Sequence, residues 1–167
     1  MAIPFYLTGK NHSETWSVLI EEANGRGQEI YSRVKETMAR HKVPDLIIED
    51  KDVAPDIIQG LKGNKRPYLM VRHDMLKGFR VLIGASDYGN QLAVWWYMIP
   101  IAKIWKKRKG ILKNFPAEMD IFDQQDLTSF LTTVHHAVVK ASKEVSDSVG
   151  FDFSKVDQKS RGFLNIS

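Results

Sequence analysis

Three β-type segments follow one another in the middle of the chain with only short linkers between them, and this arrangement restricts the fold more than any other feature. The segments are Tyr68–Arg72, Phe79–Ala85 and Leu92–Ile99, all rich in β-branched and aromatic residues. The linkers, residues 73–78 and 86–90, contain the Asp, Asn and Gly typical of turns. Because a parallel connection needs about a dozen residues or more, the segments are expected to pair as an antiparallel meander.

The third segment is apolar on both of its faces. Successive side chains of a strand point to opposite sides, so one side carries Leu92, Val94, Trp96 and Met98, and the other carries Ala93, Trp95, Tyr97 and Ile99. Either the strand is covered on both faces, or one face meets a partner or a ligand. In the second case, Trp95 and Tyr97 are the residues expected to line a pocket or an interface, where aromatic side chains are enriched.

A first long helix, about residues 12–41, is predicted from apolar residues that recur at steps of three or four. They include Trp16, Leu19, Ile20, Ala23, Ile30, Val34 and Met38. The stretch Asn24-Gly25-Arg26-Gly27 interrupts this pattern, and each interior glycine costs about 1 kcal/mol relative to alanine. A kink, a break or the close approach of another backbone is therefore expected there.

A second long helix is predicted for about residues 124–148, with an apolar stripe from Leu127 to Val145. Asp123 is the expected N-cap, and Phe122 is expected to pack on Leu127 as a hydrophobic staple. Both helices need an apolar surface to cover, and the meander supplies it. The predicted fold is thus a two-layer α+β sandwich: an antiparallel sheet of four or five strands, with the meander at 67–99 and the two helices packed on it.

The composition fits one globular domain, because 43% of the 167 residues are hydrophobic and 26% are charged. This domain is expected to span residues 1–150, followed by a tail, 151–167, that is either docked or flexible. The absence of cysteine excludes disulfides, thiolate metal sites and cysteine nucleophiles. With no signal peptide and no apolar run long enough for a bilayer, a cytoplasmic protein without a membrane span is expected.

The positive charge of the chain is concentrated in one segment. The formal net charge is +4, and residues 101–113 hold six basic side chains and no acidic one: Lys103, Lys106, Lys107, Arg108, Lys109 and Lys113. Such a segment, with Trp105 among the charges, can bind nucleic-acid phosphates or an anionic membrane surface. The same residues also fit a solvated helix with Trp105 packed inward.

Evidence for catalysis is sparse. The five histidines show no metal-ligand spacing, and the adjacent His135 and His136 point about 100° apart on a helix, as surface or boundary residues. Asp45 and Glu49 are about 13 Å apart on one extended run, too far to share an ion. His73-Asp74 could form an acid/base pair, although turns favour Asp for backbone reasons. No metal or other cofactor is expected.

Three functions follow in order of support. The first is a non-catalytic binding or assembly module that contacts another protein or a second copy of itself. It would use Trp95, Tyr97 and Trp105, or the C-terminal tail 151–167. The alternative is a nucleic-acid-binding accessory protein that uses the basic segment 103–113. The third and least supported is a metal-dependent enzyme that uses the acids around Glu49.

Overall fold

The computed structural model describes residues 14–53, 65–100, 120–162 and 164–167. The elements in chain order are β1 (Glu14–Glu21), α1 (Gly27–His41), β2 (Leu46–Val53), β3 (Arg66–His73), β4 (Phe79–Tyr88), β5 (Gln91–Pro100), α3 (Ile121–Val149), the 3-10 helix η3 (Phe153–Lys155) and β6 (Arg161–Gly162). Six strands form one sheet in the order β2-β3-β4-β5-β1-β6, and every pairing is antiparallel.

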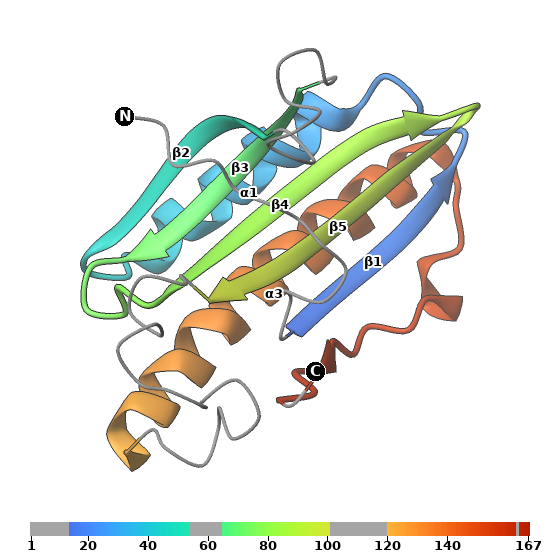
Figure 1. Ribbon diagram of the computed structural model, residues 1–167. Helices are drawn as coiled ribbons and strands as arrows, with labels where there is room; N and C mark the ends of the chain where they lie inside the picture. The colour runs from blue at the N-terminus through green and yellow to red at the C-terminus, as the bar shows by residue number, and fades with distance from the viewer. Residues whose placement is uncertain (1–13, 54–64, 101–119, 163) are drawn as a thin grey trace.

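Both helices lie on the same side of the sheet, behind the strands in Figure 1. The main core lies between the two layers and includes the fully buried Leu92, Val94, Trp96 and Met98 of β5. The predicted α+β class, the meander and the two helices packed on the sheet are therefore confirmed, with six strands instead of four or five. The predicted apolar stripe of α3, from Leu127 to Val145, is also buried in this core.

The first part of the predicted helix 12–41 is wrong, because residues 14–21 form the strand β1. Trp16, Val18 and Ile20 are buried and alternate with the exposed Ser17, Leu19 and Glu21, which is the period of a strand. Trp16 and Ile20 are four residues apart, a spacing that places two side chains on the same face of a helix and also on the same face of a strand. The positions of these two residues therefore fit both structures. The predicted buried stripe includes Leu19, but this side chain is 49% exposed on the opposite face.

The glycine-containing stretch 24–27 is where the chain passes from β1 into α1. The predicted break occurs there, and so does the predicted approach of another backbone. A Cβ on Gly27 would lie 3.3 Å from the carbonyl oxygen of Ala85 in β4. A larger residue at the start of α1 would therefore push this helix away from the sheet.

The Tyr31 side chain of α1 bridges β3 and β4 by hydrogen bonds, just beyond the last paired residues of these two strands. The ladder pairs residues 68–71 with 81–84, and the next residue of β3 is Pro67, which has no N–H to donate. The Tyr31 hydroxyl donates to the Pro67 carbonyl and accepts from the Ala85 amide, at 2.9 Å in both cases. Burial raises the pKa of Tyr31, which keeps this hydroxyl protonated and able to donate.

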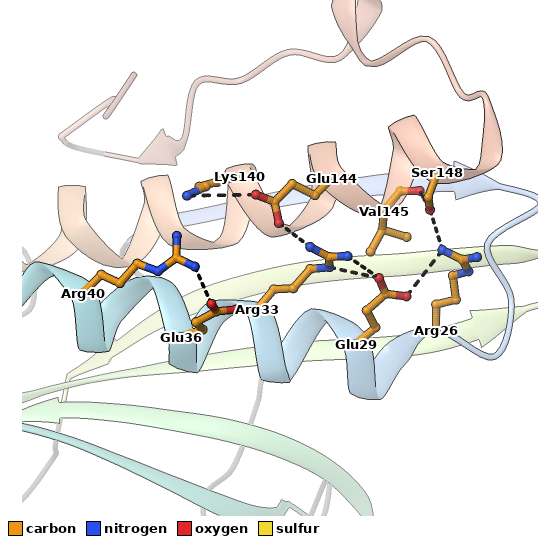
Figure 2. A network of polar contacts seen from close by, with 9 residues as sticks. All are labelled: Arg26, Glu29, Arg33, Glu36, Arg40, Lys140, Glu144, Val145 and Ser148. Atoms are coloured by element: carbon orange, nitrogen blue, oxygen red, sulfur yellow. Dashed lines mark hydrogen bonds and ion pairs between the residues drawn. The ribbon is translucent and has the colours of Figure 1, made fainter.

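A polar network joins the outer surfaces of the two helices (Figure 2). Arg33 of α1 lies 2.7 Å from Glu29 of the same helix and 2.6 Å from Glu144 of α3. Arg26 contacts Ser148 at the other end of the network. These side chains are about one-third exposed, so each pair contributes only about 0–1 kcal/mol. The network therefore connects the two helices but adds little to the stability of the fold.

The start of α3 differs from the prediction by three residues. The N-cap is Asp120, whose side chain accepts from the Asp123 amide at 2.8 Å, so Asp123 lies in the first turn of the helix. The predicted staple is also wrong: Phe122 is 73% exposed, whereas Leu127 is buried in the core. Asp120 and Asp123 are each followed three residues later by another Asp, so the sequence pattern allows either residue as the N-cap.

The described part of the tail 151–167 lies against β1 and α3. Its strand β6 pairs with the start of β1, and Phe153 and Ile166 are buried. The Glu14 carboxylate, 0% exposed, accepts hydrogen bonds from three tail groups. These donors are the Ser160 hydroxyl, the Leu164 amide at 2.9 Å and the Asn165 amide at 3.1 Å.

His135 of α3 is buried under this tail, so its prediction as a surface or boundary residue is wrong. Its ring packs edge-on against Trp16 and Trp96, with centroids 5.9 and 5.8 Å away. Nδ1 accepts from the Trp96 indole at 3.2 Å, which leaves Nε2 to donate to the Gln158 carbonyl at 2.7 Å. Both nitrogens of a neutral imidazole are thereby paired.

This arrangement predicts that acid destabilises the protein through His135. Burial lowers its pKa below the value of the unfolded chain, about 6.5. The unfolded chain therefore binds more protons below that pH, and the free energy of unfolding falls as the pH drops, by at most about 1.4 kcal/mol per pH unit for one group. Urea unfolding at pH 7 and 5.5 should show a smaller loss for His135→Gln than for the wild type. His136 and Glu14, which also act on this ring, remain in both proteins, and equal losses would contradict the prediction.

Candidate anion-binding site on the open face of the sheet

The open face is the side of the sheet turned away from α1 and α3. No helix or strand among the described residues lies on it (Figure 1). Strand pairing places its side chains in rows that run across β3, β4 and β5: Met70, Leu82 and Tyr97 in one row, and Tyr68, Gly84 and Trp95 in the next. Neighbouring rows are about 6.7 Å apart, because each is two residues further along a strand.

The middle of the open face forms a second, smaller apolar cluster, separate from the main core. Its buried members are Val53, Tyr68, Met70, Leu82 and Ile99. Trp95 and Tyr97, the two residues predicted to meet a partner, pack against this cluster and remain partly exposed. The structure therefore places both on the face that the helices do not cover. Trp105, the third predicted partner residue, lies outside the described residues.

Trp95 sits directly over Gly84 on the neighbouring strand. A Cβ on Gly84 would lie 2.5 Å from Nε1 and Cε2 of the indole, so only glycine leaves room for the ring. Tyr68 approaches the indole edge-on, with ring centroids 6.1 Å apart and an interplanar angle of 70°. Burial raises the pKa of Tyr97, which keeps its hydroxyl neutral at pH 7.

Two arginines lie next to each other at the hairpin end of the open face. Arg72 and Arg80 follow Met70 and Leu82 in the register of β3 and β4. Burial and then repulsion by Arg72 lower the pKa of Arg80, while Glu49 partly offsets them. Like charges opposite each other on neighbouring strands destabilise a sheet.

The arginines line a cavity of about 210 Å³, called here the hairpin pocket. Its lining consists of Arg72, His73, Asp74, Lys77, Phe79 and Arg80. Three of these side chains are cationic and one is a carboxylate. That carboxylate, Asp74, lies 3.0 Å from Arg72. Outside the lining, Glu49 lies 3.6 Å from Arg72 and 3.8 Å from Lys51. Three cationic side chains among the described lining residues favour an anionic ligand.

The acid/base pair considered for His73 and Asp74 is not formed. His73 Nδ1 accepts from the Met75 amide at 3.2 Å, and Asp74 is engaged by Arg72. The hairpin pocket itself was missed from the sequence. The available signal was that Arg72 and Arg80 flank the same loop, so that hairpin pairing brings them together. The six predicted basic residues of segment 103–113 lie outside the described residues.

The acids around Glu49 diverge. Glu49 is on the open face with Arg72 and Lys51, whereas the neighbouring Asp50 points to the helix side, 2.8 Å from Lys35. Within residues 14–53, 65–100, 120–162 and 164–167, no three His, Cys, Asp or Glu side chains are placed to hold a metal ion. The third functional hypothesis therefore finds no converging carboxylates in this part of the chain.

Comparison of this chain with known proteins assigns no role to the residues of the site. The chain has no significant match to a protein-family model, to a curated protein or to a solved structure. None of the helices that the structure describes is long and apolar enough to cross a membrane.

Proposed function

We propose that the protein is a non-catalytic binding module of the cytoplasm, and that it holds an anionic group of its ligand in the hairpin pocket. One observation carries this proposal: Arg72, Lys77 and Arg80 line the same cavity, whose described lining includes one carboxylate, that of Asp74. Guanidinium groups bind phosphates and carboxylates through paired hydrogen bonds. Two adjacent guanidiniums that repel each other gain further when an anion lies between them.

The pocket is supported by a well-connected hairpin loop. The Leu76 amide donates to the His73 carbonyl and the Phe79 amide to the Leu76 carbonyl, both at 3.0 Å. The Asp74 amide donates to the Asp45 carbonyl at 3.0 Å, which ties the loop to the start of β2. Phe79 and Leu76 are buried beneath it. A site held in this way loses little conformational entropy when it binds a ligand.

Calorimetric titration with inorganic pyrophosphate at low salt tests this function. The wild type should bind, and Arg72→Gln/Arg80→Gln should bind at least about tenfold more weakly, because each charge-assisted hydrogen bond contributes about 1.5–3 kcal/mol. The matched control, Arg40→Gln/Lys140→Gln, removes two cations from the helix layer and should bind like the wild type. Absence of binding by the wild type, or equal affinities of the two double variants, would overturn the proposal.

A further inference from the structure

We infer that Asn24 is a site of spontaneous deamidation, and that its conversion to isoaspartate loosens the junction between β1 and α1. The chain contains a single Asn-Gly dipeptide, Asn24-Gly25, and it lies at this junction. In the reaction, the Gly25 nitrogen attacks the side-chain carbonyl carbon of Asn24. Glycine favours this attack because it has no side chain beside the attacking nitrogen.

The structure leaves the reacting groups of this dipeptide accessible. Asn24 is exposed, and its side chain forms no hydrogen bond with another residue that the structure describes. Apart from the adjoining residues, no described atom lies within 4 Å of the position that a Cβ on Gly25 would occupy. Water can therefore reach the turn, and the leaving group can depart from it. In contrast, the Asn90 side-chain amide donates to Glu22 at 2.7 Å.

The reaction needs only water as a co-reactant. A bond forms from the Gly25 nitrogen to Cγ of Asn24 as the Cγ–Nδ2 bond breaks, and ammonia leaves with the proton that the Gly25 amide loses. The product is a cyclic imide. Water opens this ring at the new Cγ–N bond to give aspartate, or at the original peptide bond to give isoaspartate. In isoaspartate, the main chain runs through the side chain of residue 24.

Asp87, at the end of β4, slows this reaction. The Gly25 amide donates to the Asp87 carboxylate at 2.9 Å. To attack Asn24, the nitrogen must leave this hydrogen bond and lose its proton, and a neighbouring carboxylate disfavours the negative charge that then develops. Because the contact is exposed, its net stabilisation is modest. Asp87 is therefore a positioning residue that delays the conversion but does not prevent it.

Isoaspartate would lengthen the main chain by a methylene group where α1 begins. The turn is closed by a hydrogen bond from the Arg26 amide to the carbonyl of the buried Ala23, at 3.3 Å. Gly27, the first residue of α1, packs closely on β4, since an added Cβ would lie 3.3 Å from the Ala85 carbonyl oxygen. The longer main chain breaks the turn and shifts the start of α1 against β4. The modified protein therefore unfolds at a lower urea concentration.

Tryptic mapping by mass spectrometry, during incubation of the full-length protein at mildly alkaline pH, tests the site. The tryptic peptide 11–26 contains two asparagines, and Asn24 should convert much faster than Asn11, which is followed by histidine. Asn24→Gln should not convert, because glutamine would have to form a larger ring. A synthetic peptide of residues 20–29 provides the reactivity of the same sequence without the fold. Absence of conversion at Asn24 in the protein, after this peptide has converted, would overturn the inference.

A second comparison tests the role of Asp87, which is exposed. Asp87→Ala should convert about fivefold faster than the wild type, the effect of losing one typical hydrogen bond. The matched control, Glu21→Gln, removes a carboxylate from the exposed end of β1 and should convert at the wild-type rate. Equal rates of Asp87→Ala and the wild type would overturn the role of Asp87.

Urea unfolding of the incubated samples tests the structural consequence. The urea midpoint of the wild type should fall as isoaspartate accumulates, whereas that of Asn24→Gln should stay constant over the same period. A constant midpoint in wild-type protein that has converted to isoaspartate would overturn the loosening of the junction.

Discussion

Replacement of Glu14 by alanine is expected to lower the free energy of unfolding by about 3 kcal/mol. The Glu14 carboxylate is completely buried and accepts hydrogen bonds from Ser160, Leu164 and Asn165. Alanine would leave the buried Ser160 hydroxyl and the part-buried amides of Leu164 and Asn165 without this acceptor, and an unsatisfied buried donor costs about 1–3 kcal/mol. The tail from residue 160 onward should then lose much of its attachment to β1.

Two control variants and two measurements make this prediction specific. Glu14→Gln keeps one acceptor oxygen and should show an intermediate loss, and Glu21→Ala, at the exposed end of the same strand, should show almost none. Urea unfolding gives the free energies, and amide hydrogen exchange shows whether residues 164–166 lose their protection. Unfolding of Glu14→Ala at the wild-type urea concentration, with the tail still protected, would contradict this account of the tail.

Gly84→Ala is expected to destabilise the protein by about 1–3 kcal/mol, although the same change in an ordinary strand is favourable by about 0.5–1 kcal/mol. The reversal of sign comes from Trp95, because the added methyl group would lie 2.5 Å from two indole atoms. The indole would have to leave its place over β4, and with it the edge-on contact with Tyr68.

A double-mutant cycle with Trp95→Leu identifies the cause. A smaller side chain at position 95 should relieve most of the clash, so the destabilisations of the two single variants should not add in Gly84→Ala/Trp95→Leu. Urea unfolding of the four proteins provides the coupling free energy. Additive losses would mean that Gly84 is required for a reason other than the position of the indole.

The parts of the fold that depend on local patterns were predictable from the sequence. The meander follows from short linkers and from alternation within each segment, and α3 follows from a long apolar stripe. The apolar spacing of residues 14–21 predicts a helix because Trp16 and Ile20 satisfy both periods, whereas the burial of Val18 and the exposure of Leu19 identify a strand. β6 was missed because its docking depends on contacts such as that between Glu14 and Ser160, which are 146 residues apart in the chain.

The candidate site was predictable only in part, for a similar reason. Trp95 and Tyr97 were identified because a strand that is apolar on both faces needs a cover on each side. Position 84 requires glycine because a larger side chain would clash with Trp95. This contact depends on the register between β4 and β5, and the periodicity of the sequence does not predict that register. The hairpin pocket likewise requires knowledge of the pairing that brings Arg72 and Arg80 together. Basic residues that are scattered in the sequence become a site only through the sheet.

The central claim is that the open face, and not the helix layer or the tail, binds the ligand. Amide chemical-shift mapping by NMR during titration with pyrophosphate tests it most directly. Pyrophosphate is expected to shift the amide signals of residues between 72 and 80. Shifts centred on α1, α3 or the tail, with residues 72–80 unaffected, would contradict it.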